Sequence, residues 1–416
     1  MPRVLIVAQA VPPNGGSHAT RIKYFIKELA ELGWEIEVLT TKIYPGTPLI
    51  DNSLLDSIPI NVSFVRTFPG PLHFYAYRKK RSLPGAVKAK KKPGFKKKLL
   101  IPDTYIEWLP SALFDVFIKK KIKKKPDIIL SSAVPYTSHL IALIISKKWK
   151  TPLVADYGDP WVYDPGNLRK GIRYSIERLL ESMVIANSNI ISVTTDSTKD
   201  LYIDKYNVEP TKLKVIPMGY DPNDFPISKH YKSNESIRFL YTGRLEPESR
   251  DANLFFLALK RLYERGHLKY CLFEFIGMFN KDLLDMVESM GLNDIIKFHP
   301  WMDHKACMEY LCKVDYLMLF GNNNSIQVPG KTFNYIGSNT PIVYFTNLSG
   351  ERDPVDEILN ESGTIYWKVE NNQSSIEEVL LELESRSSFE NSNKANQLFT
   401  WENRVKELSE IMTSLL

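Results

Sequence analysis

The segment QVPGKTFNYIGSNTPIVYF, residues 327–345, has the residue types of a phosphate-binding helix start. Pro329 and Gly330 stand where a loop becomes a short helix, and Lys331 falls in the first helical turn, ahead of a buried strand that opens at Pro341. The first N–H groups of a helix have no partner within the helix and can receive an anionic oxygen. A lysine is unfavourable at that end of the helix dipole unless an anion offsets it. The segment therefore predicts an anion site; an ordinary loop with a solvated lysine is the alternative.

A second cation follows a strand in the segment YTGRLEPESR. Arg244 leaves this strand directly behind Gly243, where a guanidinium can meet a diphosphate through two parallel hydrogen bonds. Each charge-assisted contact of this kind contributes about 1.5–3 kcal/mol. The alternative is a surface ion pair of Arg244 with Glu246 or Glu248. Together with Lys331, Arg244 forms a predicted diphosphate clamp.

Two segments of the first half also follow predicted strands. PPNGGSHATR contains Gly15 and Gly16, which lack side chains and let the backbone approach another group closely. Its spacing is not GxGxxG, so the nicotinamide dinucleotide fingerprint is absent. ADYGDPW places Asp156 and Asp159 beside Trp161, a combination of carboxylates and a flat ring that suits a sugar. A plain strand–helix turn and a capping Asp are the structural alternatives.

The elements that must position these residues alternate between buried strands and amphipathic helices. Continuous apolar runs predict parallel strands at 3–8, 35–40, 127–130, 152–156, 189–194 and 212–217. The pattern restarts after a polar linker at 221–236, with strands at 238–243, 271–277, 295–300, 316–320 and 341–345. Such sheets bind ligands at the carboxyl ends of their strands, where the four segments lie. The sequence predicts two similar doubly wound α/β domains joined by one hinge.

Composition narrows the class of protein. A chain of 416 residues suggests two or three domains, and 44% hydrophobic with 25% charged residues is ordinary for a soluble globular protein. The first apolar run, Val4–Ala8, is too short for a signal peptide, and no apolar run approaches the ~20 residues that span a bilayer. Cys271, Cys307 and Cys312 lack metal-site spacing, so we expect reduced thiols in a cytoplasmic protein.

Taken together, the four segments resemble the family-4 type of retaining glycosyltransferases with the GT-B fold, over nearly the whole chain. VIPMGYDPNDF is similar to the domain-junction signature of that family, YTGRLEPE to its phosphate-binding turn, and TWENRVKEL to its closing helix. DYGDPW resembles a segment of a branch that acts in bacterial surface polysaccharide assembly. We therefore expect Rossmann-like domains at 1–222, with a basic insertion at about 70–125, and at 223–398, with a helix at 399–416 packing back on the first domain.

The resemblance implies transfer of a sugar from a nucleotide diphosphate donor to a saccharide or lipid-linked acceptor, with retention and without a metal or cofactor. It implies donor contacts mostly from the second domain and acceptor contacts from the first. The implied residues are Asp159, Arg244 and Lys331 for catalysis; Gly15, Gly16, Gly243, Arg244, Arg250, Gly330, Lys331, Thr332 and Asn334 for the donor; and Arg21, Asp156 and Trp161 for the acceptor.

The sequence departs from that family at three points. Ile326 and Asn334 stand where two glutamates are usual, which weakens the donor-sugar contact. The usual histidine after the DIILSS strand is not evident, and we expect His139 to be a core or surface residue. Two alternatives therefore stay open: a nucleotide-sugar epimerase of the same fold, and a non-catalytic nucleotide-sugar or polyanion-binding protein.

One segment carries the basic excess of the chain. Arg78–Lys125 contains 17 Lys and Arg against three acids, a net charge of +14 in a chain of net charge +6. Its lysine runs flank an apolar stretch with Tyr105, Trp108, Phe114 and Phe117. Basic residues beside aromatic ones favour docking on an anionic membrane surface over nucleic acid binding or a solvated loop. We therefore expect a peripheral protein at the inner face of the cell membrane.

Overall fold

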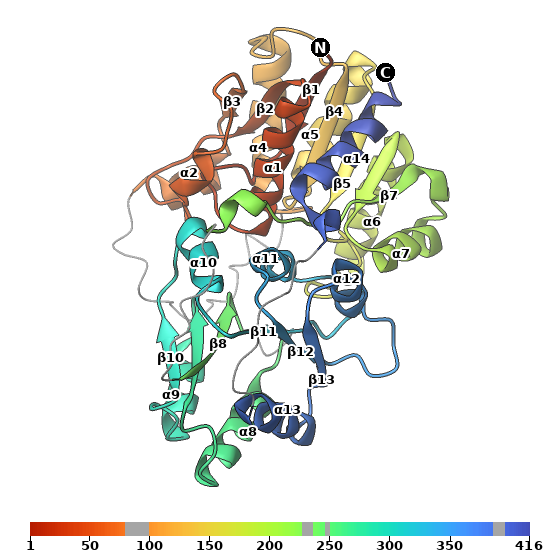
Figure 1. Ribbon diagram of the computed structural model, residues 1–416. Helices are drawn as coiled ribbons and strands as arrows, with labels where there is room; N and C mark the ends of the chain where they lie inside the picture. The colour runs from red at the N-terminus through yellow and green to blue at the C-terminus, as the bar shows by residue number, and fades with distance from the viewer. Residues whose placement is uncertain (80–99, 227–235, 246–249, 386–395) are drawn as a thin grey trace. The chain divides into compact units, whose positions relative to one another are not determined.

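The computed structural model describes residues 1–79, 100–226, 236–245, 250–385 and 396–416, which form two compact units (Figure 1). Unit 1 holds the described residues up to Met218 together with Trp401–Leu416, and unit 2 holds those from Gly219 to Thr400. Each unit is built on its own parallel sheet with helices between successive strands. The predicted GT-B architecture of two doubly wound domains is confirmed.

The sheet of unit 1 has seven parallel strands in the order β3-β2-β1-β4-β5-β6-β7. Their bounds are β1 Arg3–Val7, β2 Glu35–Thr41, β3 Ser63–Thr67, β4 Ile128–Ala133, β5 Leu153–Tyr157, β6 Ile190–Val193 and β7 Leu213–Val215. Successive residues of a strand face opposite sides of the sheet. Leu5 and Val7 accordingly join one apolar cluster, and Val4 and Ile6 join the other. Both faces are covered, which explains the continuous apolar runs in the sequence.

Two groups of helices cover the faces of this sheet. One face packs against α1 Ser17–Glu31 and α14 Trp401–Thr413. The other packs against α4 Trp108–Leu113, α5 Thr137–Trp149 and α6 Gly171–Asn187. The remaining helices of the unit are α2 Pro71–Tyr77 and α7 Asp196–Tyr206, with a π-helical turn at Phe114–Ile118 and 3-10 turns at Asn52–Leu55, Thr104–Glu107 and Pro210–Lys212.

The last helix of the chain returns to unit 1. The Trp401 ring stacks on Tyr24 of α1 with ring centroids 5.1 Å apart. Near the other end of α14, Ser409 accepts a hydrogen bond of 2.8 Å from the Trp34 indole. Because Val405 and Leu408 are fully buried on the same side, α14 is part of the apolar core of unit 1.

The sheet of unit 2 has six parallel strands in the order β10-β9-β8-β11-β12-β13. The strands are β8 Ile237–Thr242, β9 Cys271–Ile276, β10 Ile296–His299, β11 Tyr316–Phe320, β12 Ile342–Thr346 and β13 Tyr366–Glu370. The helices are α8 Asn253–Glu264, α9 Lys281–Ser289, α10 His304–Leu311, α11 Lys331–Ser338, α12 Pro354–Ser362 and α13 Gln373–Ser385, with 3-10 turns at Pro222–Asp224 and Gln397–Phe399. Two strands, β3 and β13, were not among the predicted ones; both lie at an edge of their sheet and are only partly buried.

Candidate active site

Lys331 is the first residue of α11, which begins at the end of the loop that follows β11. Its Nζ is buried and makes no hydrogen bond to any residue that the structure describes. The ammonium instead lies 3.7 Å from the centroid of the Tyr241 ring at the end of β8. Burial, reinforced by the nearby positive charge of Arg250, holds the pKa of Lys331 well below its usual value. A buried amine with no polar partner is costly, so this position is a candidate for a ligand that supplies one.

The backbone around Lys331 is shaped for close approach. Gly243 has φ +110°, a conformation that favours glycine, and a Cβ there would lie 2.7 Å from the Lys331 Nζ. Gly277, after β9, has φ +157°, and a Cβ on it would lie 2.2 Å from the Gly243 carbonyl oxygen. Side chains at either glycine would therefore displace the lysine or the turn. Gly243 was predicted for this site, whereas Gly277 was not.

The other predicted donor residues of unit 2 lie around the same turn. Arg250 donates a hydrogen bond of 2.7 Å from Nε to Asn322 Oδ1, which follows β11, and its charge acts on Lys331. Arg244 is exposed, and its carbonyl oxygen accepts a 2.7 Å hydrogen bond from the Tyr241 hydroxyl. Thr332 Oγ1 is buried without a hydrogen-bond partner in the described part of the chain. Unit 2 thus brings two arginines, an amine and a hydroxyl to one edge of its sheet.

Gly330 and Asn334 lie at the same helix start as Lys331. Gly330 is the N-cap residue immediately before α11. Asn334 is half-buried and lies one turn further along the helix. The alternative partners of Arg244, Glu246 and Glu248, lie outside the described residues.

In unit 1, Asp159 forms an ion pair that sequence reasoning missed. His18, in the first turn of α1, lies with Nε2 3.4 Å from Asp159 Oδ2, and each side chain is about one third exposed, at 31% and 32%. Burial lowers the pKa of His18, but the hydrogen bond and charge of Asp159 outweigh it, and the net pKa is raised. A Cβ at Gly158 would lie 2.9 Å from the imidazole, so a glycine is required for this contact. The unit therefore presents a partly exposed acid–base pair at the carboxyl edge of its sheet.

The glycine pair before α1 serves the backbone. Gly16 is the residue preceding the helix and has φ +99° with no atom near its Cβ position. Gly15 donates a backbone hydrogen bond of 2.6 Å to the Leu49 carbonyl, and a Cβ on it would lie 2.9 Å from that oxygen. Gly16 thus leaves the first turn of α1 open, whereas Gly15 fixes the loop.

Arg21 and Asp156, predicted to bind the acceptor, form a buried pair instead. Arg21 Nη2 lies 2.7 Å from Asp156 Oδ1, and the two side chains are 1% and 0% exposed. Ser132 and Ser192 donate further hydrogen bonds to the carboxylate, at 2.8 and 2.7 Å. Although burial raises the pKa of Asp156, Arg21 and these hydrogen bonds outweigh it and lower the pKa. Since neither side chain has surface to offer an acceptor, we assign this pair to joining α1 to the sheet.

Trp161 is likewise a core residue. Its ring is fully buried and stacks on Tyr136 with centroids 4.8 Å apart. Its indole N–H donates a 2.8 Å hydrogen bond to Glu177 Oε2 of α6. The ring therefore has no free face for a sugar, and its predicted contact with the acceptor is replaced by a packing role.

In the described part of the chain, neither His139 nor a cluster of metal-ligating residues forms a second candidate site. His139 is fully buried, lies 2.8 Å from Ser131 Oγ through Nδ1, and has a pKa lowered to about 3 by burial. It is therefore a neutral core histidine. Across the described ranges, no three His, Cys, Asp or Glu residues are grouped so as to hold a metal ion.

The described end of the basic insertion is partly core and partly surface. Trp108 is fully buried and donates to Thr67 Oγ1 at 2.6 Å, and Tyr105 stacks on His73 at 3.8 Å. Phe114 and Ile118 are 50% and 67% exposed, and the lysines at 119–121 and 123–125 beside them are exposed. The lysine runs at 88–92 and 96–98 lie outside the described residues.

Comparisons with known proteins agree with this arrangement. Residues 16–219 match the family of glycosyl transferase 4-like domains. Sucrose-phosphate synthase from Thermosynechococcus elongatus has a similar structure, with a TM-score of 0.69 and 14% identity over 100% of this chain and 98% of its own. HepE from Anabaena, in complex with UDP and glucose, gives 0.63 and 12% over 100% of both chains.

A UDP-N-acetylglucosamine 2-epimerase is also similar, with a TM-score of 0.58 and 13% identity over 99% of this chain and 95% of its own. No curated protein sequence matches the chain. At these identities the solved structures establish the fold. Residues 16–219 are a glycosyl transferase 4-like domain, and the chain has the GT-B fold.

Proposed function

We propose that this protein transfers a sugar from a nucleotide diphosphate donor to a saccharide or lipid-linked saccharide acceptor, with retention, in the assembly of a surface polysaccharide. Unit 2 binds the donor diphosphate, and unit 1 binds the acceptor. Arg244 and Lys331 offset the negative charge that grows on the leaving phosphate, an effect for which one lost donor costs about 10²–10³ in rate. Asp159 lies near the reacting sugar or the acceptor hydroxyl.

The observation that carries this proposal is the buried Lys331 amine. It lacks a hydrogen-bond partner among the described residues, lies at the start of a helix, and occupies space that a side chain on Gly243 would contest. A diphosphate oxygen at this point would receive the ammonium and the first N–H groups of α11 together. The similar HepE structure contains UDP, which supports a uridine nucleotide as the first donor to test.

A thermal-shift screen with nucleotide sugars tests the donor step. Because binding adds RT ln(1 + [L]/Kd) to stability, the correct donor raises Tm in proportion to its affinity. We expect UDP-glucose or another nucleotide sugar to raise Tm of the wild type and, at the same concentration, to raise that of Lys331→Met much less. Lys297→Met, an exposed lysine on β10, is the matched control and keeps the wild-type shift. If no nucleotide sugar shifts the wild type, the transferase proposal fails.

An epimerase is the second candidate, since one epimerase has a similar structure. The two reactions differ in their need for an acceptor. Incubating the protein with its stabilising nucleotide sugar alone separates them: an epimerase converts the sugar to its epimer, whereas the proposed transferase leaves it intact until a saccharide is added. Loss of the exposed acid–base pair through Asp159→Asn should slow transfer without weakening donor binding in unit 2.

Docking on an anionic membrane surface extends the proposal. The described residues contain no helix of sufficient length and apolarity to cross a bilayer. Phe114 and Ile118 are nevertheless exposed beside six exposed lysines between 119 and 125, which we define as the 114–125 patch. Apolar side chains among cations suit an anionic lipid surface, where each Lys or Arg contributes about 1 kcal/mol.

Vesicle flotation tests this patch. We expect the wild type to float with vesicles that contain anionic lipid, to stay behind with neutral ones, and to bind less in high salt. The double variant Phe114→Ser, Ile118→Ser should bind several-fold less. Tyr270→Ser, which removes an aromatic ring that is 74% exposed in unit 2, is the control and should float normally. Equal flotation of both variants would remove the patch from the proposal.

A further inference from the structure

Helix α6 of unit 1 buries acidic side chains and exposes large apolar ones. Its two glutamates, Glu177 and Glu181, are both 0% exposed. A helix at the surface of a domain ordinarily turns its apolar residues toward the core and its charged residues toward water. Four apolar side chains of α6 form an exposed row, which we name the α6 stripe: Ile172, Ile176, Leu179 and Met183, with exposed fractions of 82%, 40%, 62% and 43%.

The buried glutamates are bonded to their surroundings and hold the stripe outward. Glu177 accepts a hydrogen bond of 2.8 Å from the Trp161 indole and one of 3.0 Å from Arg169. Glu181 accepts one of 2.7 Å from the Tyr202 hydroxyl. If α6 turned its apolar row toward the core, these hydrogen bonds would break and their partners would stay buried, which is costly. The exposure of the stripe is therefore fixed by the fold.

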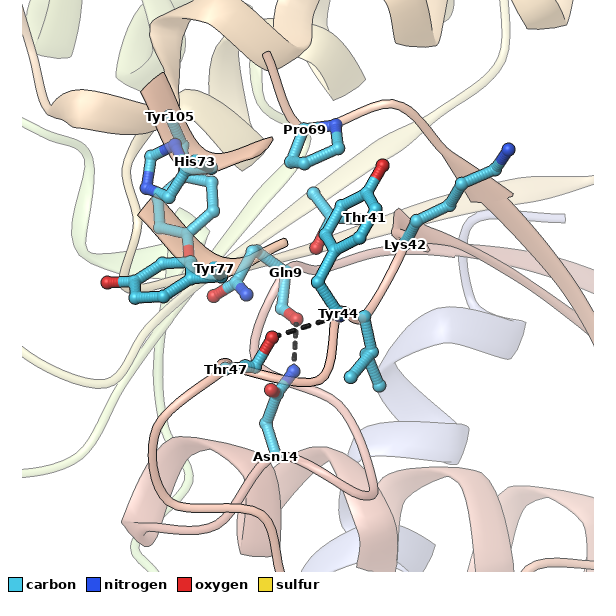
Figure 2. A pocket seen from close by; sticks show the side chains of 11 residues that line it. Gln9, Asn14, Thr41, Lys42, Tyr44, Thr47, Pro69, His73, Tyr77 and Tyr105 are labelled. Atoms are coloured by element: carbon cyan, nitrogen blue, oxygen red, sulfur yellow. Dashed lines mark hydrogen bonds between the residues drawn. The ribbon is translucent and has the colours of Figure 1, made fainter. Parts of the chain in front are cut away.

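The first turn of α6 is also anchored to the neighbouring part of unit 1. Arg173 donates a hydrogen bond of 2.6 Å to the Pro102 carbonyl. The turn after Pro102 is held in place in its own right, because the Tyr105 ring stacks on His73 with centroids 3.8 Å apart (Figure 2). A helix that is already ordered loses little conformational entropy when a partner binds to it. The stripe is thus a preformed surface.

The spacing of the stripe is that of a helix–helix seam, and it is the same in both directions along the chain. The steps between its residues are four, three and four, which place all four side chains on one face of the helix. Because this order survives reversal, two antiparallel copies of α6 bring Ile172 opposite Met183 of the second copy and Ile176 opposite Leu179 of the second copy. A twofold axis makes every such contact occur twice. The stripe is therefore complementary to itself.

The residues that flank the stripe favour a second helix over a lipid surface. Ser175 and Ser182 lie on one side of it, and small side chains let another helix approach closely. The exposed cation next to them, Arg178, donates to the Tyr174 hydroxyl at 3.1 Å and to the Lys205 carbonyl at 3.4 Å, which draws its guanidinium toward α7. Helices that lie on membranes instead carry Lys and Arg along their polar face, whereas the polar face of α6 holds the two buried glutamates.

We propose that the α6 stripe is the contact surface of a homodimer, in which two copies of α6 pack antiparallel about a twofold axis. This proposal concerns assembly and does not depend on the proposed transfer reaction. Standard interfaces bury about 800 Å² on each partner, and one pair of helices provides less than that. We therefore expect a reversible dimer that dissociates on dilution.

Sedimentation velocity of the full-length protein over a dilution series tests the dimer. We expect the wild type to pass from dimer to monomer as its concentration falls through the micromolar range. Leu179→Glu places a carboxylate in the seam twice per dimer and should weaken association by about 100-fold or more. Ile144→Glu is the matched control, because Ile144 is 38% exposed on the neighbouring helix α5 and lies outside the stripe. It should associate like the wild type, and circular dichroism should show both variants folded.

A pair of compensating charges tests the antiparallel arrangement. Ile176→Lys and Leu179→Glu should each be monomeric alone, because each sets a charge against an apolar side chain of the second copy. An equal mixture of the two should dimerise, since the introduced cation then faces the introduced carboxylate. A mixture that stays monomeric overturns the antiparallel seam, and equal loss of association in Ile144→Glu overturns the role of the stripe. A wild type that is monomeric throughout, yet floats with anionic vesicles while Leu179→Glu does not, would make the stripe a lipid-binding surface and overturn the dimer.

Discussion

The two units of this protein treat a buried cation in opposite ways. In unit 1 the Arg21 guanidinium is matched by the Asp156 carboxylate at 2.7 Å and by the carbonyl oxygens of Ile216 and Pro217. In unit 2 the Lys331 amine is buried with an aromatic ring and no hydrogen-bond partner in the described residues. A buried charge with its partners in place holds a fold together, whereas one without them is a position for a ligand.

The largest loss of stability is expected when the negative charge of the buried Arg21–Asp156 pair is removed. Asp156→Asn leaves the Arg21 guanidinium buried and uncompensated, which costs about 3–5 kcal/mol. We expect the Tm of the variant to fall by about 10 °C in differential scanning calorimetry. Asp204→Asn, which removes an exposed carboxylate that pairs with Lys205 at 2.6 Å, should change Tm by less than about 2 °C. Equal melting of the two variants would show that the buried pair contributes nothing.

Removing the charge of Lys331 in unit 2 should leave the stability of the fold intact and weaken nucleotide-sugar binding. Lys331→Met keeps the length and apolar stem of the side chain and deletes an unpaired amine, so Tm should hold or rise. Losing one charge-assisted contact of about 1.5–3 kcal/mol should weaken UDP-sugar affinity by about 10–150-fold in calorimetric titration. A large fall in Tm with unchanged affinity would place Lys331 with the structural cations.

The partly exposed pair of His18 and Asp159 in unit 1 should have the smallest effect on stability. Because the pKa of His18 is raised by Asp159, this pair stabilises the fold fully below about pH 6.5, and the contribution is lost as pH rises through the folded-state pKa. Both side chains are about one third exposed, so the effect is below about 1 kcal/mol. NMR titration should show the His18 pKa falling in Asp159→Asn. An unchanged pKa would mean that the two side chains do not interact in solution.

The fold was largely predictable because burial on both faces leaves a direct trace in the sequence. Residues 5–7 of β1 and the strand Tyr316–Phe320 are buried at every position and read as unbroken apolar runs. The edge strands Ser63–Thr67 and Tyr366–Glu370 mix exposed and buried residues, so the sequence resembles a loop there. Edge strands need less apolar surface, and the signal weakens with it.

Site residues were predictable from the sequence where their role depends on neighbouring residues, and were not where it depends on a residue far along the chain. The anion position at Lys331 depends on a glycine, a lysine and a helix start within a few residues, so residue types alone identified it. The burial of Arg21 in an ion pair depends on Asp156, which lies 135 residues away in the sequence, so the sequence did not reveal it. His18 was missed for the same reason, since its partner Asp159 follows a different strand. A histidine two residues after the glycine pair was the signal that could have drawn attention to it.

The central claim is that the Lys331 amine receives the donor diphosphate, and proton linkage tests it most directly. Burial lowers the pKa of Lys331, so the amine gains a proton when a diphosphate supplies the missing partner. Titration of UDP-glucose over a pH series, in buffers of different ionisation enthalpy, should show proton uptake at pH values between the lowered pKa of the free amine and the higher pKa of the liganded one, and affinity that falls as pH rises. The uptake should vanish in Lys331→Met. Tight binding with no proton uptake, or the same uptake in the variant, would contradict the account.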